Sequence, residues 1–249
     1  MLISAGEIIK SSWDLYKKNW KHFTAYVLLL ILPSLLLGAL TAGLSVLSFI
    51  YFSNNTILNV ALLLAVIAAA LVFGLWISIG LAQAIKTRLS NQELPTFRSM
   101  LGSTSHLIWP VIFTSLLTSL IILGGVLLFV IPGIIFMVWY SFTYYIVVFD
   151  GQRGANALRA SKSLVIGRWW QMVWRMIVPI FLFNLIGWII SVLISLPFEL
   201  FLSEQANEIA FQASSTIVNI VITPLVVASS IILFLSAKEN PLTAPATQQ

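Results

Sequence analysis

The residues best suited to chemistry in this sequence are five basic side chains between positions 150 and 175, interspersed with three tryptophans. Positive charge beside indole rings is typical of a surface that binds anionic lipid headgroups, to which each Lys or Arg contributes about 1 kcal/mol. The same charges would recognise an acidic protein partner. The alternative is that they only set the orientation of the chain in a membrane. The basic residues are Arg153, Arg159, Lys162, Arg168 and Arg175, and the tryptophans are Trp169, Trp170 and Trp174.

Side chains for covalent or metal chemistry are scarce. The chain has no Cys, two His and eight Asp and Glu residues. His22 and His106 each precede an apolar segment and have no clustered carboxylates, so they do not form the ligand set of a metal site. No nucleophile with a neighbouring general base is recognisable either. We therefore expect no enzymatic activity, no bound metal and no cofactor.

Three uncharged polar residues, Asn184, Asn219 and Thr223, lie inside long apolar segments. Asn184 and Asn219 are suited to an interhelical hydrogen bond, which in membranes is worth about 0.6 kcal/mol on average. The alternative is that the three side chains line a path for a substrate. No Asp, Glu, Lys or Arg lies deep in these segments, which argues against proton-coupled transport.

The composition indicates that a membrane positions these residues. The chain is 59% hydrophobic and 8% charged, whereas soluble domains are about 25% charged. Four long segments carry no charged residue: 22–85, 99–149, 176–198 and 209–237. A membrane-spanning helix needs about 20 apolar residues, so the first two segments hold two spans each and the last two hold one each. The sequence predicts an all-α, polytopic membrane helix bundle with six transmembrane helices, and it excludes soluble, disordered and nucleic-acid-binding proteins.

Turn residues divide the two longest apolar segments. Ser53-Asn54-Asn55 is polar. In Ile131-Pro132-Gly133, Pro removes a backbone donor and Gly tolerates the dihedral angles of a tight turn. The alternative at this second position is one long, bent helix. The predicted spans are about 23–51, 57–85, 107–130, 133–149, 176–197 and 209–236.

All 13 Lys and Arg residues fall in segments 1–22, 86–106, 150–175 and 237–249. The opposite connections hold none, and the 197–208 connection carries three Glu instead. By the positive-inside rule, the basic segments and both termini are cytoplasmic. We expect a multi-pass membrane protein with no cleavable signal peptide and a disordered tail over 238–249.

Two cytoplasmic segments, 5–20 and 154–166, are expected to form amphipathic helices. Ser4 and Glu7 have the spacing of a capping box before the first helix. That helix places aromatic and aliphatic side chains on one face opposite lysines, so it either lies in the headgroup plane or packs under the bundle. The apolar face comprises Ile9, Trp13, Tyr16 and Trp20.

The two amphipathic segments are also similar to each other. Aligning Ser12 with Ser161 pairs Lys10 with Arg159, and Trp20 with Trp169. Each segment is followed by an apolar helix that contains a proline. This pattern suggests parallel repeats, each of one amphipathic helix and one transmembrane hairpin.

Residues 131–175 resemble a known family. The shared features are Ile131-Pro132-Gly133, then Asp150-Gly151, then Ala157-Leu158-x-x-Ser161-x-x-Leu164-Val165-x-Gly167-x-Trp169-Trp170. They are similar to the glycerophosphoryl diester phosphodiesterase membrane domain and related bacterial and archaeal membrane proteins of unknown function. The resemblance implies a membrane module without the phosphodiesterase barrel, because this chain lacks the barrel's cluster of acidic residues and His. It also implies that the protein lies in a bacterial or archaeal cell (inner) membrane. Ala160 stands where the family often has a basic residue, and no catalytic residue is carried over.

These observations predict a single membrane domain over 1–237 that is not an enzyme. Its expected role is a membrane-organising or partner-binding module, whose basic cytoplasmic face contacts anionic lipid headgroups or a protein partner and binds no nucleic acid. The alternative is a transporter or lipid translocator that is not coupled to protons through intramembrane charges.

Overall fold

The computed structural model describes residues 2–51, 56–93, 97–199 and 203–241, and every regular element in them is a helix. The all-α prediction is therefore confirmed. In chain order the elements are α1 (Ala5–Tyr51), α2 (Thr56–Leu89), α3 (Phe97–Thr104), the short 3₁₀ helix η1 (Ser105–Leu107), α4 (Ile108–Leu128), α5 (Val130–Trp139), α6 (Thr143–Asp150), α7 (Gly154–Val165), α8 (Trp169–Glu199) and α9 (Glu204–Glu239).

Among the described residues, five helical segments are long and apolar enough to cross a membrane. Much of their apolar surface is open, as at Leu71 and Leu127, whose exposed fractions are 68% and 78%. A protein folded in water buries most large apolar side chains, so this surface fits a multi-pass membrane protein. The five segments are Val60–Leu89, Ser99–Leu128, Val130–Asp150, Trp169–Phe198 and Asn207–Glu239.

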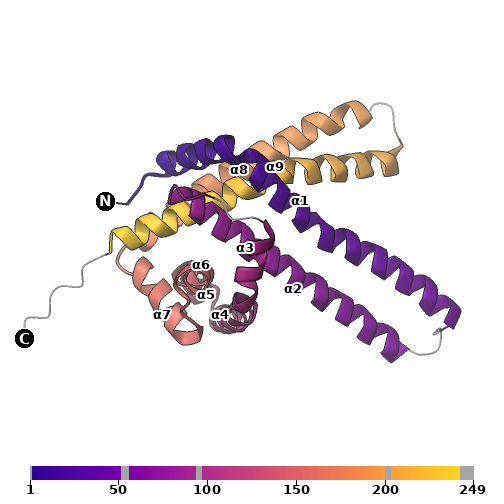
Figure 1. Cartoon of the computed structure of the whole chain (residues 1–249), viewed down its shortest axis with the longest axis horizontal. Coiled ribbons are helices and arrows are strands. Elements are labelled where there is room, and N and C mark those ends of the chain that lie inside the picture. Colours follow the sequence, from indigo (N-terminus) through magenta and orange to yellow (C-terminus); the bar gives the residue numbers. More distant parts are fainter. Residues whose placement is uncertain (1, 52–55, 94–96, 200–202, 242–249) are drawn as a thin grey trace, which may run out of the picture.

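The long helices form three hairpins, α1–α2, α4–α5 and α8–α9 (Figure 1). The α1–α2 and α8–α9 hairpins project away from the end of the molecule at which the N-terminus lies, whereas α4 and α5 are seen end-on in the same view. The three hairpins thus leave a common base in different directions. The buried core occupies this base, where the first part of α1 and the C-terminal halves of α2 and α9 meet α6 and α7.

The α4–α5 turn lies slightly before the position expected from the Pro-Gly pair. The chain reverses at Phe129, which is extended (φ −160°, ψ 146°), and Pro132 and Gly133 lie in the first turn of α5. Pro is tolerated there because the first amides of a helix have no partner within the helix. Gly133 and Gly125 let the two helices approach closely, since a Cβ on Gly133 would lie 2.9 Å from the backbone N of Val126.

The predicted span 133–149 forms two short helices, α5 and α6, separated at residues 140–142. The break contains no Gly or Pro. It is instead stabilised by Ser161 of α7, whose hydroxyl donates to the carbonyl of Trp139 at 2.7 Å and accepts from the N–H of Phe142 at 3.2 Å. The side chain therefore replaces backbone partners that a continuous helix would supply.

The N-terminal half of α1 begins with the predicted capping box. The backbone N–H of Ser4 donates to the Glu7 carboxylate at 2.9 Å, and the N–H of Glu7 donates to the Ser4 hydroxyl at 3.2 Å. A kink follows at Asn19, whose φ and ψ are −128° and 17°. This kink separates the predicted amphipathic segment 5–20 from the apolar remainder of α1.

The amphipathic part of α1 packs on α9, but the buried face is shifted by one residue from the predicted face of Ile9, Trp13, Tyr16 and Trp20. Ile8, Ser12 and Tyr16 are buried, and the hydroxyls of Ser12 and Ser229 lie 3.0 Å apart. Trp13 and Trp20 keep exposed fractions of 42% and 51%. Packing under the bundle is thus observed for one face, and the tryptophan face stays open.

Candidate functional site

Helix α7 positions two of the predicted basic residues on the outside of the molecule. Its buried face consists of Ala157, Leu158, Ser161 and Val165, and this face fixes which side chains point outward. Arg159 is exposed, as is Arg153, the residue that precedes the helix. Lys162 is half-buried. We call Arg153, Arg159 and Lys162 the basic surface.

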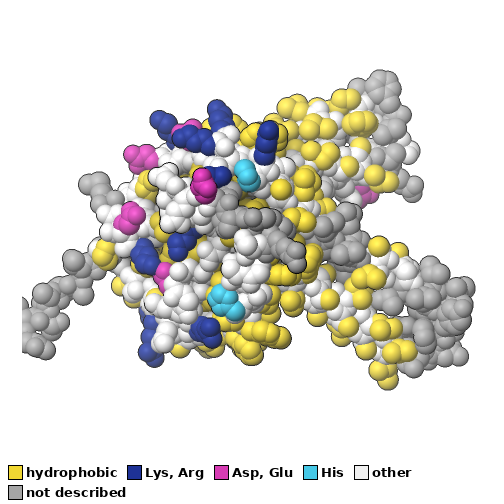
Figure 2. All heavy atoms as spheres, in the orientation of Figure 1, with side chains coloured by type: hydrophobic (Ala, Val, Ile, Leu, Met, Phe, Trp, Pro, Cys, Tyr) yellow, Lys and Arg dark blue, Asp and Glu magenta, His cyan; other side chains and the backbone are white. Residues whose placement is uncertain are grey.

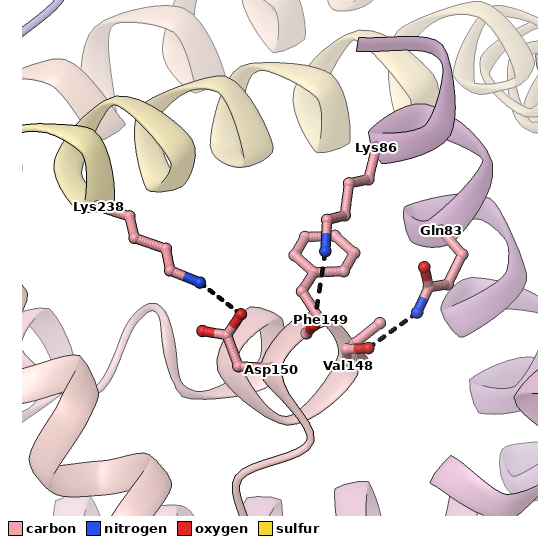
Figure 3. Close-up of polar contacts among 6 residues, drawn as sticks. All are labelled: Gln83, Lys86, Val148, Phe149, Asp150 and Lys238. Atoms are coloured by element: carbon pink, nitrogen blue, oxygen red, sulfur yellow. Dashed lines mark hydrogen bonds and ion pairs between the residues drawn. The ribbon is translucent and has the colours of Figure 1, made fainter. Parts of the chain in front are cut away.

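The connection that leads into α7 is held by residues from distant helices (Figure 3). The amide of Gln83 in α2 donates to the carbonyl of Val148 at 2.8 Å. The ammonium group of Lys86 lies 3.5 Å from the carbonyl of Phe149 and 4.5 Å from the centre of its ring. Positive charge at the C-terminus of α6 is favourable because the last carbonyls of a helix carry partial negative charge.

Lys238 of α9 completes this arrangement with an ion pair to Asp150, with Nζ and Oδ1 2.6 Å apart. Gly151 then adopts the left-handed conformation (φ 68°) that commonly ends a helix. The chain is thereby turned toward Arg153, so the start of the basic surface is fixed by packed elements of the fold.

An apolar groove adjoins the basic surface, between α5 and the turn that connects α7 to α8. The cavity has a volume of about 550 Å³. The ammonium group of Lys162 lies 4.1 Å from the centre of the Trp139 ring in its wall, a cation–π contact. We call this cavity the α5–α8 groove, and its lining residues are Ile131, Ile134, Ile135, Trp139, Ile166, Gly167, Trp169 and Trp170.

Tryptophans dominate the outer side of the α5–α8 groove. Trp170 is exposed, and Trp169 contacts it edge to face, with ring centres 4.7 Å apart. The buried indole nitrogen of Trp169 has no hydrogen-bond partner among the described residues.

Arg168 and Arg175, the other two predicted contact residues, are engaged inside the protein. Arg168 is 6% exposed, and its guanidinium group donates to the carbonyls of Leu164, Ala237 and Asn240 at 2.6–2.8 Å. Burial and the nearby Arg175 lower the pKa of this group. Arg175 donates to the carbonyl of Ile3 at 2.7 Å. These two arginines hold the ends of the described chain against α8.

The distribution of charge over the surface follows the fold (Figure 2). Lys and Arg side chains gather over the base of the molecule, around the N-terminal part of α1 and the α6–α7 region. The described parts of the two projecting hairpins show mainly hydrophobic side chains. Lys17 and Lys21 lie over the exposed rings of Trp13 and Trp20, at 5.3 and 5.8 Å from the ring centres.

Two of the three predicted polar residues of α8 and α9 share a cavity of about 270 Å³. Asn184 and Asn219 both line it, together with Ser191 and Ser215. The Asn184 amide donates to the carbonyl of Ile180 in its own helix at 2.7 Å, and no hydrogen bond joins it to Asn219 in the described structure. Thr223 is half-buried on α9 and is not part of the lining.

A second polar cavity, of about 230 Å³, lies between α4 and the α5–α6 break. Sequence reasoning missed it, although the pairs Thr114-Ser115 and Thr118-Ser119 recur at a spacing of four residues and so share one helix face. We call it the hydroxyl cavity. Its lining residues are Val111, Thr114, Ser115, Thr118, Ser119, Tyr140, Ser141, Thr143, Tyr144 and Val147.

Within the residues that the structure describes, no group of three or more His, Cys, Asp or Glu side chains could hold a metal ion. Comparison with protein-family models, curated proteins and solved structures finds no match for the chain. The resemblance of residues 131–175 to a membrane-domain family therefore stays a prediction, and function has to be argued from the geometry alone.

Proposed function

We propose that this protein is a non-enzymatic module of a bacterial or archaeal cell membrane that binds an anionic phospholipid at its basic surface. One acyl chain would occupy the α5–α8 groove, and the phosphate would lie against Lys162 and the neighbouring arginines. The observation that carries the proposal is that Lys162, on the helix that also carries the exposed Arg159, contacts the wall of an apolar groove of about 550 Å³. Lipids combine these two chemistries in one molecule.

The proposal includes six spans, with both termini in the cytoplasm. The apolar part of α1, residues 23–51, is the sixth span; it carries no charged residue and packs along α2. The α4–α5 hairpin, which is seen end-on beside the other two in Figure 1, supplies the third and fourth spans.

Single-cysteine labelling tests this topology directly, because the chain has no native Cys. Ser203→Cys and Phe129→Cys should react with a membrane-impermeant maleimide in intact cells. Ser11→Cys and Ser163→Cys should react only after permeabilisation. Labelling of Phe129→Cys from the cytoplasmic side would contradict the proposed path of α4–α5.

Lipid selectivity tests the basic surface. Three cations contribute about 3 kcal/mol to the binding of an anionic headgroup, or roughly a hundredfold in affinity. Full-length protein in nanodiscs should retain phosphatidylglycerol over phosphatidylcholine in native mass spectrometry. Arg153→Gln, Arg159→Gln and Lys162→Gln combined should abolish this preference.

The matched control is the combination Lys10→Gln, Lys17→Gln and Lys18→Gln on α1, which removes the same charge from exposed positions. This variant should keep the preference for phosphatidylglycerol. An equal loss in both variants would show a general effect of charge, without a lipid site at the α5–α8 groove.

Lipid translocation is a second candidate function, favoured by the α8–α9 cavity that Asn184 and Asn219 line. Polar side chains on neighbouring helices could guide a headgroup through the apolar layer. Protein in liposomes should then move fluorescent phospholipid between leaflets, and Asn184→Leu with Asn219→Leu should slow this movement. Absence of movement with the unaltered protein would eliminate this candidate.

A further inference from the structure

We propose that the hydroxyl cavity between α4 and the α5–α6 break binds a small uncharged polyol. Eight of its ten lining residues carry a hydroxyl group, and the other two are valines. The site is separate from the basic surface and from the α5–α8 groove. The hydrogen-bonding capacity, charge and size of the cavity favour such a ligand.

Two hydroxyl groups of the cavity already donate hydrogen bonds to backbone carbonyls. Thr118 donates to the carbonyl of Thr114 at 2.7 Å, and Ser141 donates to the carbonyl of Val138 at 2.9 Å. A hydroxyl that donates in this way retains its oxygen lone pairs. Thr118 and Ser141 therefore offer acceptors to a ligand.

Thr143 supplies the complementary donor. Its side-chain oxygen is buried and has no hydrogen-bond partner among the described residues, and the residue as a whole is 4% exposed. Burying a polar group without a partner costs about 1–3 kcal/mol, and a ligand hydroxyl in the cavity would recover that cost. A molecule that both donates and accepts satisfies this lining best.

The lining favours a neutral ligand over an ion. It contains no Asp, Glu, Lys or Arg, and an ion buried without a countercharge is strongly disfavoured. The rings of Tyr140 and Tyr144 and the side chains of Val111 and Val147 give the cavity apolar walls. A polyol presents C–H groups as well as hydroxyls, so it matches both parts of the lining.

Size limits the ligand further. Pockets for drug-sized molecules measure about 300–1,000 Å³, and this cavity measures about 230 Å³. A polyol of three to five carbon atoms is of the appropriate size, and a disaccharide is too large.

The location of the cavity also favours a binding site. The break at residues 140–142 interrupts the candidate span Val130–Asp150 near its middle. Interrupted helices at membrane depth are tolerated where they are enclosed by protein or line a polar cavity, and in transporters they form substrate sites. This step rests on the proposed membrane crossing, and the arguments from hydrogen bonding and charge do not.

The test is binding of erythritol to the full chain, purified in detergent without any polyol and followed by saturation-transfer NMR. We expect saturable binding that Thr143→Val weakens about tenfold, which corresponds to the loss of one hydrogen bond. Thr143→Val breaks no hydrogen bond seen in the structure, so it should fold. The matched control is Thr216→Val, since Thr216 is exposed and its hydroxyl bonds only within α9 at 2.8 Å.

Three results would overturn the proposal. Absence of saturable binding would leave a cavity filled with water, and displacement of erythritol by sodium ions would identify an ion site. Equal binding by the unaltered protein and by Thr143→Val would remove Thr143 from the site and contradict the proposal as well. Phosphatidylglycerol selectivity, measured on the same Thr143→Val protein, separates this outcome from the lipid proposal. That selectivity should be unchanged whether or not erythritol binds.

Discussion

The backbone N–H of Phe142 donates to the hydroxyl of Ser161, 3.2 Å away and 19 residues later in the chain. The same hydroxyl donates to the carbonyl of Trp139 on the other side of the α5–α6 break. One buried side chain of α7 thus satisfies backbone groups on both sides of the interruption.

Ser161→Ala should therefore lower the free energy of unfolding by about 1–3 kcal/mol, because it leaves a buried N–H and a buried carbonyl without these partners. The matched control is Ser163→Ala, whose exposed hydroxyl bonds only to the carbonyl of Ala160 in its own helix. Denaturant titration of both variants in mild detergent checks the difference. Equal stability of the two would mean that the α5–α6 break does not depend on Ser161.

Gly133→Ala should destabilise the α4–α5 hairpin by about 1–3 kcal/mol, the usual cost of overpacking. The added methyl group would meet the backbone and side chain of Val126. Gly124→Ala is the control, since nothing lies within 4 Å of a Cβ at that position. It should be neutral or slightly stabilising because Ala favours helix. Thermal unfolding followed by circular dichroism distinguishes the two, and a stable Gly133→Ala protein would contradict the close approach of α4 and α5.

Arg168→Gln should cost more stability than Arg159→Gln. Arg168 makes three hydrogen bonds to carbonyl groups at helix ends, and hydrogen bonds to a charged group contribute about 1.5–3 kcal/mol. Arg159 is exposed, so its replacement should leave stability within about 0.5 kcal/mol. Midpoints of unfolding measure both. An Arg168→Gln protein as stable as the Arg159→Gln protein would show that the C-terminus of α9 does not need this arginine.

Fraying of the first turn of α1 should depend on pH through Glu7. Hydrogen bonds from the Ser4 backbone and side chain lower the pKa of this carboxyl group. Because the folded pKa lies below the unfolded one, the stabilisation is complete above the unfolded pKa and is lost as pH falls through the lowered folded value. The N–H groups of Ser4, Glu7 and Ile8 donate hydrogen bonds in this turn. Their amide exchange, corrected for its intrinsic dependence on pH, should therefore lose protection as the solution is acidified through that range. Glu7→Gln should show no such step, and a step of equal size in Glu7→Gln would exclude Glu7 as its source.

Much of the helical organisation follows from the sequence because charge and turn residues act locally. The capping box at Ser4 and Glu7 forms as predicted. The predicted helix 154–166 is found as Gly154–Val165, one residue shorter. In each case the determining residues lie within a few positions of the feature, so their spacing is sufficient.

Other features depend on contacts between distant parts of the chain. Arg159 and Arg168 both belong to the basic segment 150–175, yet Arg168 is buried because the end of α9, about 70 residues further on, packs against it. The α5–α6 break contains no Gly or Pro from which it could be predicted, and it depends on a hydrogen bond to Ser161 of α7. The recurrence of Thr and Ser in α4 indicates a polar helix face. The hydroxyl cavity itself could not be predicted, because it forms only where this face meets the α5–α6 break.

The contacts around α6 determine how the whole chain should unfold. This helix of eight residues follows Phe142, whose N–H donates to Ser161 of α7. It contacts α2 through Gln83 and Lys86, and α9 through the Lys238 ion pair. Loss of any one hairpin would expose backbone and charge that α6 shares with the others. Heating should accordingly give one cooperative transition in calorimetry, and the three hairpins should not melt as independent units.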